Sequence, residues 1–488
     1  MKKILWLISM LIASISCSIA QTTNYEAVLP DMGDTDRSNL SPLEADYLGK
    51  QVISDIKRQG DMANDLDASD YLNNLGNSLV SYSALAGYPF TFYLIKDHDI
   101  NAFALPGGYI CIYNGLIFNT QSEAELVSVM SHEIGHVVQH HIFRNIAVYN
   151  RGQWLALAGL LAGGLLATVN PGAAIVAANA GGGMAMQNML SFSRDFEREA
   201  DRVGQSLMYN ADYDPHAMPE FFQRLKKVNQ FNDNEAYAFL RTHPVTSERI
   251  SEAQERANQM HVKMHPDSPS FLLIREKARV RQLGASKAVS FYTTSINDKK
   301  YASLDAQYFG LAFAYYVLQQ YNKSLSALSK ITDEDFVDHP AVLSLKARDY
   351  TGIKKFAIAQ DIYVNAQLSY PNYKNLWLGE VDLYMYSHQF KKAENKINDL
   401  LQTYPNDIDL WAYAASLYSD ANLNNPQKYY YSLGNIQYLL SNYKEALVQY
   451  QNALSVKNSN DSELNDIIIS KISNTKDKII SFKQFNNL

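Results

Sequence analysis

The stretch His132-Glu133-Ile134-Gly135-His136 is the most informative part of this sequence. Residues four positions apart share one face of a helix, so both imidazoles can reach one metal ion. Glu133 projects beside them, where a carboxylate can take a proton from a metal-bound water. Apolar residues flank the pentapeptide on both sides, which indicates that this face points inward. Buried histidines and a buried carboxylate need partners, and a metal supplies them. The pattern therefore predicts a zinc site, with one Zn2+ per chain, rather than two histidines on a surface helix.

A third ligand is expected from a separate element, because zinc in a hydrolase takes three protein ligands and leaves one position for water. Residues 193–204, SRDFEREADRVG, offer the carboxylates of Asp195, Glu197, Glu199 and Asp201. Glu197 and Asp201 are four positions apart on an expected helix, so one can bind the metal while the other braces a histidine ligand. Taken alone, this segment is also compatible with a solvated, charged helix face.

The residues around the pentapeptide predict helices and a small sheet. Apolar spacing is helical from residue 44 to about 84, and a helix over 122–148 carries the pentapeptide. The strand-like runs are residues 89–95, 102–105 and 109–113. Pro106-Gly107-Gly108 separates the last two runs, which is typical of a hairpin. We therefore expect a small antiparallel sheet beside the helices.

The chain beyond residue 265 contains a repeat. Pro371 and Pro405 are 34 positions apart, and so are Trp377 and Trp411. This is the period of the tetratricopeptide (TPR) repeat, a helix pair in which small residues allow close approach. Further positions that fit the pattern are Tyr308, Ala312, Tyr315, Ala347, Ala359, Ala366, Tyr384, Ala393, Gly434, Ala446, Tyr450 and Ala453. Between Trp411 and Gly434 the register slips, which predicts an irregular helix there.

Composition excludes several classes of protein. A chain of 488 residues allows roughly two to three domains, and 47% hydrophobic residues argue against long disorder. The net charge of −7 argues against nucleic acid as the main partner, because phosphate binding needs a basic face. The two cysteines, Cys17 and Cys111, are too few for a disulfide framework.

The N-terminus has the pattern of an export signal. Two lysines precede the apolar residues 4–15, and Ser18-Ile19-Ala20 places small residues before a cleavage point. The apolar run is shorter than the ~20 residues that a membrane-spanning helix needs. We expect cleavage after Ala20 and a periplasmic mature chain. Lipid anchoring at Cys17 is the disfavoured alternative, because Ser14 stands where lipoprotein signals usually carry leucine.

A second apolar stretch covers residues 154–186. It is broken by Asn170-Pro171-Gly172 and by Gly181-Gly182-Gly183, and its first run is short for a spanning helix. A pair of buried helices is the first interpretation of this stretch. A flap over the site, or a surface that touches a membrane or a client protein, is the alternative.

Four segments together resemble a known family. They are NAFALPGGYICIYNGL (101–116), HEIGH (132–136), SRDFEREADRVG (193–204) and THPVTSERI (242–250). In this order they are similar to the zinc-peptidase family that contains the CAAX prenyl proteases and the membrane protease HtpX. The export signal and the TPR repeats point to a periplasmic branch of that family. The resemblance implies the zinc ligands His132, His136 and Glu197.

The resemblance also implies roles for the residues around the metal. Glu133 is the general base, and Asp201 braces a zinc histidine. His243 and Arg249 match a downstream histidine and arginine that face the metal, and His243 or Arg249 is a candidate to help stabilise the oxyanion. His243 has a second interpretation as a fourth zinc ligand, a latch that closes the position of the catalytic water. His140 is expected beside the ligands or exposed.

An edge strand is the last feature that the resemblance implies. An extended substrate is expected to pair with it as an added strand, along residues Asn101, Ala102, Phe103, Ala104 and Leu105. The glycine-rich stretch 154–186 occupies the place where membrane members of the family carry spanning helices, and peripheral membrane contact through it is one interpretation.

The fold class expected from these observations is α+β and mostly helical. A zincin-like HEXXH metalloprotease domain with a small antiparallel sheet is followed by an all-α TPR solenoid. The expected boundaries are 1–20 for the signal peptide, 21–45 for a tether, 46–265 for the metalloprotease domain and 266–488 for the repeats.

The expected function is that of a zinc metalloendopeptidase in the periplasm. From the resemblance, its expected partners are misfolded or stalled outer-membrane β-barrel proteins, or their assembly machinery, held through the TPR repeats. The alternative is a chaperone or docking factor whose proteolysis is secondary, because repeats bind proteins without chemistry. Prenyl-peptide processing is disfavoured, because that activity belongs to members of the family with several spanning helices.

Overall fold

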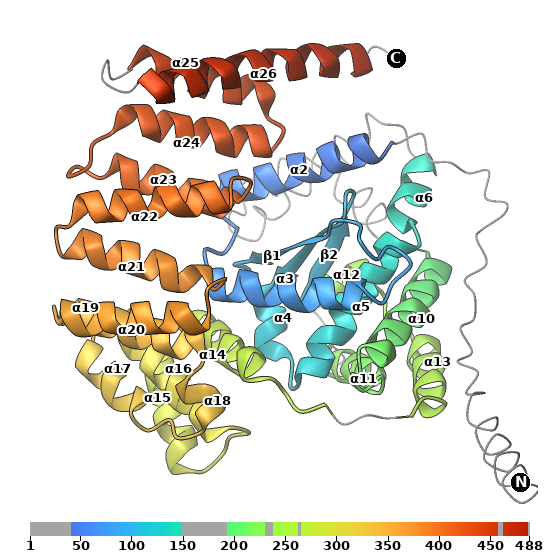
Figure 1. The fold of residues 1–488 in the computed structure, drawn as a ribbon. Helices are drawn as coiled ribbons and strands as arrows, with labels where there is room; N and C mark the ends of the chain where they lie inside the picture. The colour runs from blue at the N-terminus through green and yellow to red at the C-terminus, as the bar shows by residue number, and fades with distance from the viewer. Residues whose placement is uncertain (1–40, 149–192, 230–237, 262–264, 457–461, 487–488) are drawn as a thin grey trace, which may run out of the picture. The chain divides into compact units, whose positions relative to one another are not determined.

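The computed structural model describes residues 41–148, 193–229, 238–261, 265–456 and 462–486 (Figure 1). The expected export signal, Cys17 and the apolar stretch 154–186 lie outside these residues. The elements before the repeats are α2 (Pro42–Gln59), α3 (Leu66–Val80), β1 (Thr91–Ile95), β2 (Ala102–Leu105), β3 (Tyr109–Tyr113), α4 (Asn114–Asn119), α5 (Glu123–Val138), α6 (His141–Val148), α10 (Arg194–Asn210), α11 (Ala217–Asn229), α12 (Ala238–Thr242) and α13 (Ser247–Asn258). The mostly helical fold class is confirmed.

The sheet has three strands in the order β1-β3-β2. β2 and β3 form the expected antiparallel hairpin, in which Leu105 pairs with Tyr109. β1 runs parallel to β3, with Thr91 opposite Tyr109, so the sheet is mixed and not antiparallel throughout. The physical reason lies in β3, whose residues are all buried and which therefore takes the central position. Residues 96–101 carry the chain from β1 past β3 to the far edge.

Two helix boundaries differ from the prediction. The expected helix over 122–148 is two helices, because His140 between α5 and α6 has a φ of 55° and interrupts the helical hydrogen bonds. α2 begins at Pro42, inside the expected tether. Ser41 and Glu44 form a capping box there, each side chain bonding the other residue's backbone N–H.

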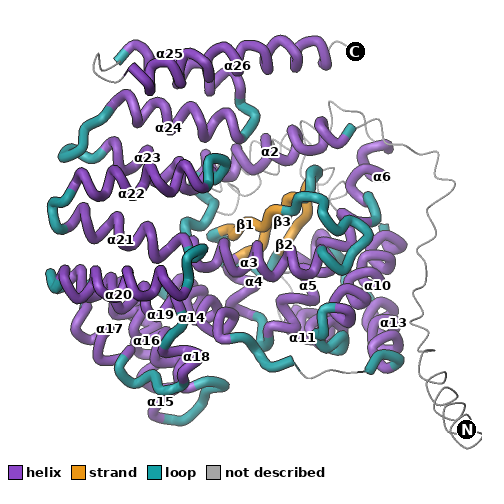
Figure 2. Tube along the Cα trace, viewed as in Figure 1, coloured by secondary structure: helices purple, strands orange, loops and turns teal. Residues whose placement is uncertain are grey.

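Helical repeats make up the rest of the described chain (Figures 1 and 2). Their helices are α14 (Pro269–Leu283), α15 (Ala285–Asn297), α16 (Leu304–Val317), α17 (Tyr321–Leu328), α18 (Glu334–Val337), α19 (Pro340–Gly352), α20 (Phe356–Ser369), α21 (Lys374–Tyr386), α22 (Phe390–Thr403), α23 (Ile408–Ser419), α24 (Pro426–Leu439), α25 (Tyr443–Ser455) and α26 (Ser462–Asn486). Close helix packing repeats along them. A Cβ atom at Gly379 would lie 2.5 Å from the hydroxyl of Tyr363, and one at Gly434 would lie 2.4 Å from the ring of Tyr450.

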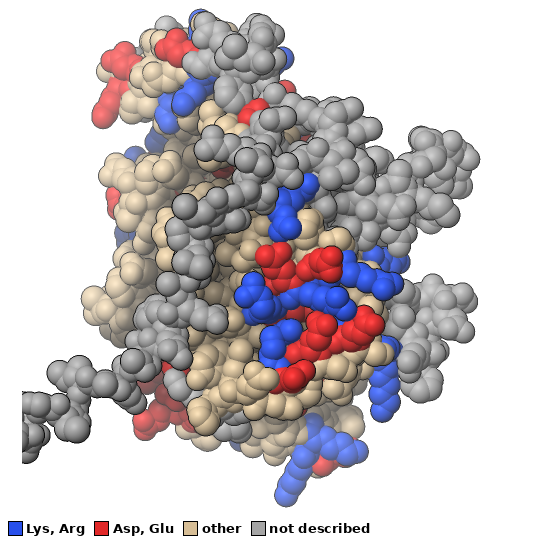
Figure 3. All heavy atoms as spheres, turned by 90° about the vertical axis from the view of Figure 1, so that its right-hand side faces the viewer, with Lys and Arg blue, Asp and Glu red and all other residues tan. Residues whose placement is uncertain are grey.

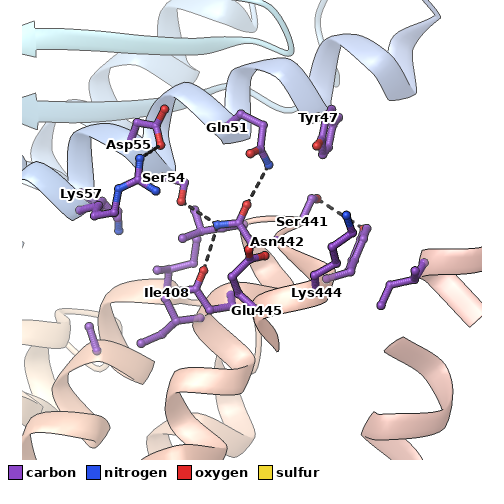
Figure 4. A pocket seen from close by; sticks show the side chains of 17 residues that line it. Tyr47, Gln51, Ser54, Asp55, Lys57, Ile408, Ser441, Asn442, Lys444 and Glu445 are labelled. Atoms are coloured by element: carbon purple, nitrogen blue, oxygen red, sulfur yellow. Dashed lines mark hydrogen bonds and ion pairs between the residues drawn. The ribbon is translucent and has the colours of Figure 1, made fainter. Parts of the chain in front are cut away.

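The helix α2 lies between the sheet and the repeats. One side of it packs Val52, Ile53 and Ile56 into a core with the sheet. On the other side, the Nδ2 of Asn442, before α25, donates to Ser54 Oγ at 2.7 Å (Figure 4). Asn442 Oδ1 accepts from Gln51 Nε2 at 2.9 Å. A cavity of about 710 Å³ opens between α2 and the helices α23 to α25 beside this contact.

A buried ionic cluster forms a second contact, between the start of α3 and the repeat helices. Lys277 on α14 lies 2.7 Å from Asp65 and 2.6 Å from Asp67, at the start of α3. Asp67 also accepts hydrogen bonds from Tyr373 and Asn375, beside and on α21. All three charged side chains are less than a tenth exposed. The acidic start of α3 is therefore held by residues from two different repeat helices.

Candidate metal centre

The pentapeptide lies in the second half of α5, which is buried almost throughout. Ser122 caps the N-terminus of the helix by accepting from the backbone N–H of Glu125. His132, Glu133 and His136 are each 0% exposed. The helix packs against α10, α11 and the strand β2, which accounts for the apolar residues on both sides of the pentapeptide.

Two glycines set the distance between α5 and α10. A Cβ atom at Gly135 would lie 2.9 Å from the carbonyl oxygen of Ala200, closer than real Cβ atoms come. A Cβ at Gly204 would lie 3.0 Å from the backbone nitrogen of His132. The two helices therefore touch backbone to backbone where one carries the histidines and the other carries Glu197.

Four donor groups converge at this contact. They are the side chains of His132, His136, Glu197 and His243, whose nearest ligand atoms lie within 4.8 Å of one another. His132 Nε2 is 3.0 Å from His136 Nε2 and 3.3 Å from His243 Nδ1. Glu197 Oε1 is 3.0 Å from His243 Nδ1 and 3.5 Å from His136 Nε2. Sequence positions up to 111 residues apart are thus brought to one point.

This arrangement fits a small divalent metal ion. A tetrahedron with metal–ligand bonds of about 2.0–2.1 Å has edges of about 3.3–3.4 Å, within the span of the observed separations. The far nitrogens of His132 and His136 are engaged by Asp201 and His141, so each Nε2 presents a lone pair to the other. In the neutral rings these lone pairs, 3.0 Å apart, repel unless a cation lies between them, either a metal ion or a proton on one ring. The donor set therefore has the chemistry of a metal site.

Asp201 and Arg249 brace the first histidine. Asp201 Oδ1 lies 2.9 Å from His132 Nδ1, and Arg249 donates to both oxygens of Asp201. A third guanidinium nitrogen, Nη1, lies 2.6 Å from Glu197 Oε2. Burial lowers the pKa of His132, but hydrogen bonds to Asp201 and Glu197 outweigh it and raise the pKa to about 9. The carboxylates thus stabilise positive charge at this point.

His141 braces the second histidine, and sequence reasoning missed it. Its Nδ1 lies 3.0 Å from His136 Nδ1, and its Nε2 lies 3.0 Å from Glu199 Oε2. Burial lowers the pKa of His141 to about 4, although Glu199 raises it, so the ring is neutral near pH 7. The sequence offered only its spacing of five from His136, and residues five apart do not share one face of a helix. The turn at His140 produces the contact by breaking the helix.

Glu133 lies beside the donor cluster without joining it. Its Oε1 is 3.5 Å from His243 Nε2. Burial raises the pKa of Glu133, while His243, His132 and the backbone amide of Ala104 oppose the shift. A carboxylate with a raised pKa can accept a proton from water and then give it up again, as a general base must.

The remaining predicted residues lie around the site or away from it. Ala102 and Leu105 are buried in β2, whereas Phe103 and Ala104 between them are half-buried. In the described part of the chain β2 has β3 on one side and no strand on the other, so it is an edge strand. Asp195 is 90% exposed at the start of α10 and is not one of the four donor groups, and His140 is exposed.

Charged side chains cover the outer side of α10 and α13. Figure 3 looks onto the right-hand side of Figure 1, where these helices lie, and shows basic and acidic side chains interleaved. Arg198 on α10 pairs with Glu248 at 3.0 Å and with Glu252 at 3.4 Å, both on α13. These exposed pairs link the outer side of α13, which also carries Arg249, to the helix that carries Glu197. The charged helix face expected from the sequence thus coexists with a buried, functional face on the same helix.

The fold and this donor set define a metalloprotease of the HEXXH class, and comparison with known proteins specifies the family. The profile of peptidase family M48 matches residues 67–257. The chain belongs to this family, together with relatives described as beta-barrel assembly-enhancing proteases.

Two of these relatives cover most of the chain. A putative beta-barrel assembly-enhancing protease of Vibrio cholerae is 33% identical over 325 residues, 66% of this chain and 67% of the relative. The beta-barrel assembly-enhancing protease of Yersinia pestis is 30% identical over 394 residues, 79% of each chain. A solved tetratricopeptide repeat protein from Parabacteroides merdae is 17% identical, covers 52% of this chain and 98% of its own, and has a TM-score of 0.29.

Proposed function

We propose that this metalloprotease is a zinc-dependent endopeptidase of the periplasm that acts on misfolded or stalled outer-membrane β-barrel proteins. The observation that carries the proposal is the convergence of three imidazoles and one carboxylate beside Glu133 in a buried site. The proposed domains are a metalloprotease domain over 46–265 and a TPR domain over 266–488, with an export signal over 1–20.

Zinc is the metal that this donor set favours. Imidazole nitrogens with one carboxylate, in four-coordinate geometry, are typical zinc ligands. We assign His132, His136 and Glu197 as the ligands that hold it during the reaction. A bound zinc ion supplies Lewis acidity and lowers the pKa of a water molecule toward ~7.

The chain's own residues supply the proton transfers. Glu133 accepts the proton of the attacking water and passes it to the leaving amine. Asp201 and Arg249 hold the ring of His132 in place, and Asp201 and Glu197 already engage all three guanidinium nitrogens of Arg249. We therefore propose that Arg249 positions His132 and Glu197. The sequence pattern also allowed a direct role in stabilising the oxyanion.

The substrate is proposed to bind as an extended strand. β2 offers an edge along Asn101, Ala102, Phe103, Ala104 and Leu105, and it packs against α5. Strand addition satisfies the backbone hydrogen bonds of an unfolded chain without reading its sequence closely. This mode suits clients that are misfolded or stalled, because only such clients offer an extended segment.

His243 has two proposed roles that exclude each other at any one moment. As a latch it is a fourth ligand that closes the tetrahedron, and its Nδ1, 3.3 Å from His132 Nε2 and 3.0 Å from Glu197 Oε1, supports this role. As an oxyanion stabiliser it must leave the donor cluster and face the substrate. The observed distances favour the latch for the resting enzyme.

Clients and compartment are proposed from the relatives and from the N-terminal sequence. The relatives' names connect them with β-barrel assembly. The repeats provide a surface for protein partners. In the described residues, no helix combines the length and the hydropathy that a membrane crossing requires.

A chaperone or docking factor remains the second candidate function. The repeat helices that contact α2 and α3 support it, because they join a binding surface to the enzyme. Expression of a Glu133→Gln variant separates the two functions. Loss of every phenotype supports the protease, whereas retained support of outer-membrane assembly supports the chaperone.

The most direct test is to trap clients on the Glu133→Gln protein in the export compartment. The variant keeps the ligands but lacks the base, so clients should accumulate on it and remain uncleaved. A matched Glu220→Gln variant, changed at an exposed position of α11, should not accumulate them. Equal accumulation on both variants would contradict a proteolytic role in client turnover.

Metal analysis of the purified protein tests the zinc assignment. One zinc per chain is expected, and His136→Ala should lose most of it. Full retention by His136→Ala would overturn the proposed ligand set. A mature chain that begins at Gln21 would support export with cleavage after Ala20. A lipid-modified Cys17 at the N-terminus would contradict that cleavage site and indicate a membrane-anchored lipoprotein.

A further inference from the structure

The two histidines of the pentapeptide are held from behind by different groups. His132 Nδ1 contacts a carboxylate directly, 2.9 Å from Asp201 Oδ1. His136 Nδ1 instead contacts another imidazole, 3.0 Å from Nδ1 of His141. A carboxylate can only accept, so His132 Nδ1 must donate to Asp201. An imidazole nitrogen can either donate or accept, so in the second contact either His136 or His141 could be the donor.

The neighbours of His141 settle that choice. Its Nε2 lies 3.0 Å from Glu199 Oε2, and a carboxylate can only accept, so Nε2 carries the proton. A neutral ring protonated at Nε2 has a lone pair at Nδ1. His141 Nδ1 therefore accepts from His136 Nδ1–H, which leaves the lone pair of His136 on Nε2. That atom is the one that faces the other three donor groups.

Two further side chains fix His141 in this orientation. Its ring stacks on that of Phe196 on α10, with centroids 4.5 Å apart and planes 6° apart. Arg144, one turn along α6, lies over the same Phe196 ring at 4.1 Å and donates to Glu199 Oε2 at 3.0 Å. His141 itself is 0% exposed. The ring is thus held by stacking in one plane and by hydrogen bonds at both nitrogens.

We propose that His141 is a positioning residue for the metal, which fixes the tautomer and the ring orientation of His136 through the relay His136–His141–Glu199. The proposal rests on the zinc site described under the proposed function. It assigns no contact of His141 with metal or substrate. Partners behind metal-binding histidines typically affect affinity by about 10–100-fold, which is the size of effect expected here.

Substitution of His141 by phenylalanine separates this role from simple packing. Phenylalanine retains a planar ring that can stack on Phe196, but it cannot accept from His136. In the full-length His141→Phe protein we expect zinc affinity, measured by competition with a chelator, to fall about 10–100-fold. The melting temperature of the metal-free protein should fall only modestly, because the ring packing is conserved although two hydrogen bonds are lost.

The visible absorption spectrum of bound Co2+ is a second measurement, and a change in packing alone should not alter it. Co2+ bound at the site absorbs according to its ligand geometry, so His141→Phe should shift or broaden the visible bands. Glu199→Gln should give a smaller loss of affinity, because its amide oxygen can still accept from His141 without the charge. This variant also keeps the proposal testable if His141→Phe does not fold.

His140→Asn is the matched control. His140 is exposed, and asparagine tolerates its positive φ of 55°. It should bind zinc as the wild type does. Wild-type zinc affinity and an unchanged cobalt spectrum in both His141→Phe and Glu199→Gln would overturn the proposal. A wild-type protein that binds zinc but cleaves no peptide would instead contradict the proposed function and leave the relay standing.

Discussion

Arg249 donates two hydrogen bonds to the carboxylate of Asp201, from Nε at 2.7 Å and from Nη2 at 2.8 Å. Both side chains are at most 2% exposed. A bidentate pair of this kind is charge-assisted and sets the carboxylate plane as well as its position. Because Asp201 contacts His132, the orientation of a proposed metal ligand depends on a residue 48 positions beyond the carboxylate.

Arg249→Lys should therefore weaken metal binding although the charge is conserved. Lysine offers a single ammonium group, which cannot hold both oxygens of Asp201 and also reach Glu197. We expect zinc affinity to fall about 10–100-fold in a chelator competition. Arg202→Lys, at an exposed position of α10, is the control and should bind as the wild type does. Equal affinities in the two variants would show that the paired geometry is unimportant.

His243→Ala tests the latch against the oxyanion role. A latch predicts unchanged or increased cleavage of an unfolded peptide, and increased self-cleavage, because the position of the catalytic water is freed. His265→Ala, at an exposed histidine outside the donor cluster, should change neither rate. If His243→Ala holds zinc yet is as inactive as Glu133→Gln, the latch is wrong and oxyanion stabilisation is supported.

Lys277→Met tests the buried ionic contact between α3 and α14. It leaves Asp65 and Asp67 buried without their shared cation, which should cost about 3 kcal/mol near pH 7. Burial raises the pKa of Asp65, but Lys277 and Arg281 outweigh it and hold the pKa below its usual value. This stabilisation is therefore present above the usual pKa of ~3.9 and is lost as the pH falls.

The destabilisation by Lys277→Met should accordingly shrink at pH 4, because the buried Asp65 of the variant, without Lys277, can take up a proton there. Urea unfolding of the full-length protein at the two pH values measures the difference. Lys300→Met, at a side chain 78% exposed, should be neutral at both. A penalty for Lys277→Met that did not depend on pH would indicate lost packing and not lost charge.

Asp349→Asn should stabilise the repeats at alkaline pH. Asp349 on α19 is 0% exposed, and burial raises its pKa to about 8 although Ser324 opposes the shift. The unfolded carboxyl ionises near ~3.9, so the folded state binds more protons between about pH 4 and 8. Stability therefore falls as the pH rises through that range, and asparagine, which resembles the protonated acid, removes the loss.

The gain from Asp349→Asn should be about 1 kcal/mol or more at pH 8 and close to zero at pH 4. Thermal unfolding of the full-length protein across this range measures it. Asp361→Asn, on the exposed side of α20, serves as the control and should show no such trend. A gain of equal size at every pH would contradict the raised pKa.

The sequence predicted local features of the site and the repeats better than it predicted tertiary contacts. The pentapeptide and the 34-residue period predicted a helical metal site and a repeat array, because both follow from helix geometry. The parallel pairing of β1 with β3 could not be predicted, since it depends on which strand has both faces covered. His141 was missed because its contact with His136 arises at a helix break, and the burial of Asp349 depends on packing between α17 and α19.

The backbone contact between α5 and α10 has a consequence for which ion the site accepts. At Gly135 and Gly204 the backbones of these helices are in direct contact. The distance between the histidines and Glu197 therefore cannot increase unless the helices separate. Calcium prefers bonds of about 2.3–2.6 Å and six to eight oxygen ligands, and this site offers neither. Copper would bind such nitrogens more tightly than zinc but prefers a flatter arrangement. The absence of side chains at Gly135 and Gly204 therefore sets the spacing of the proposed ligands through the main chain of the two helices.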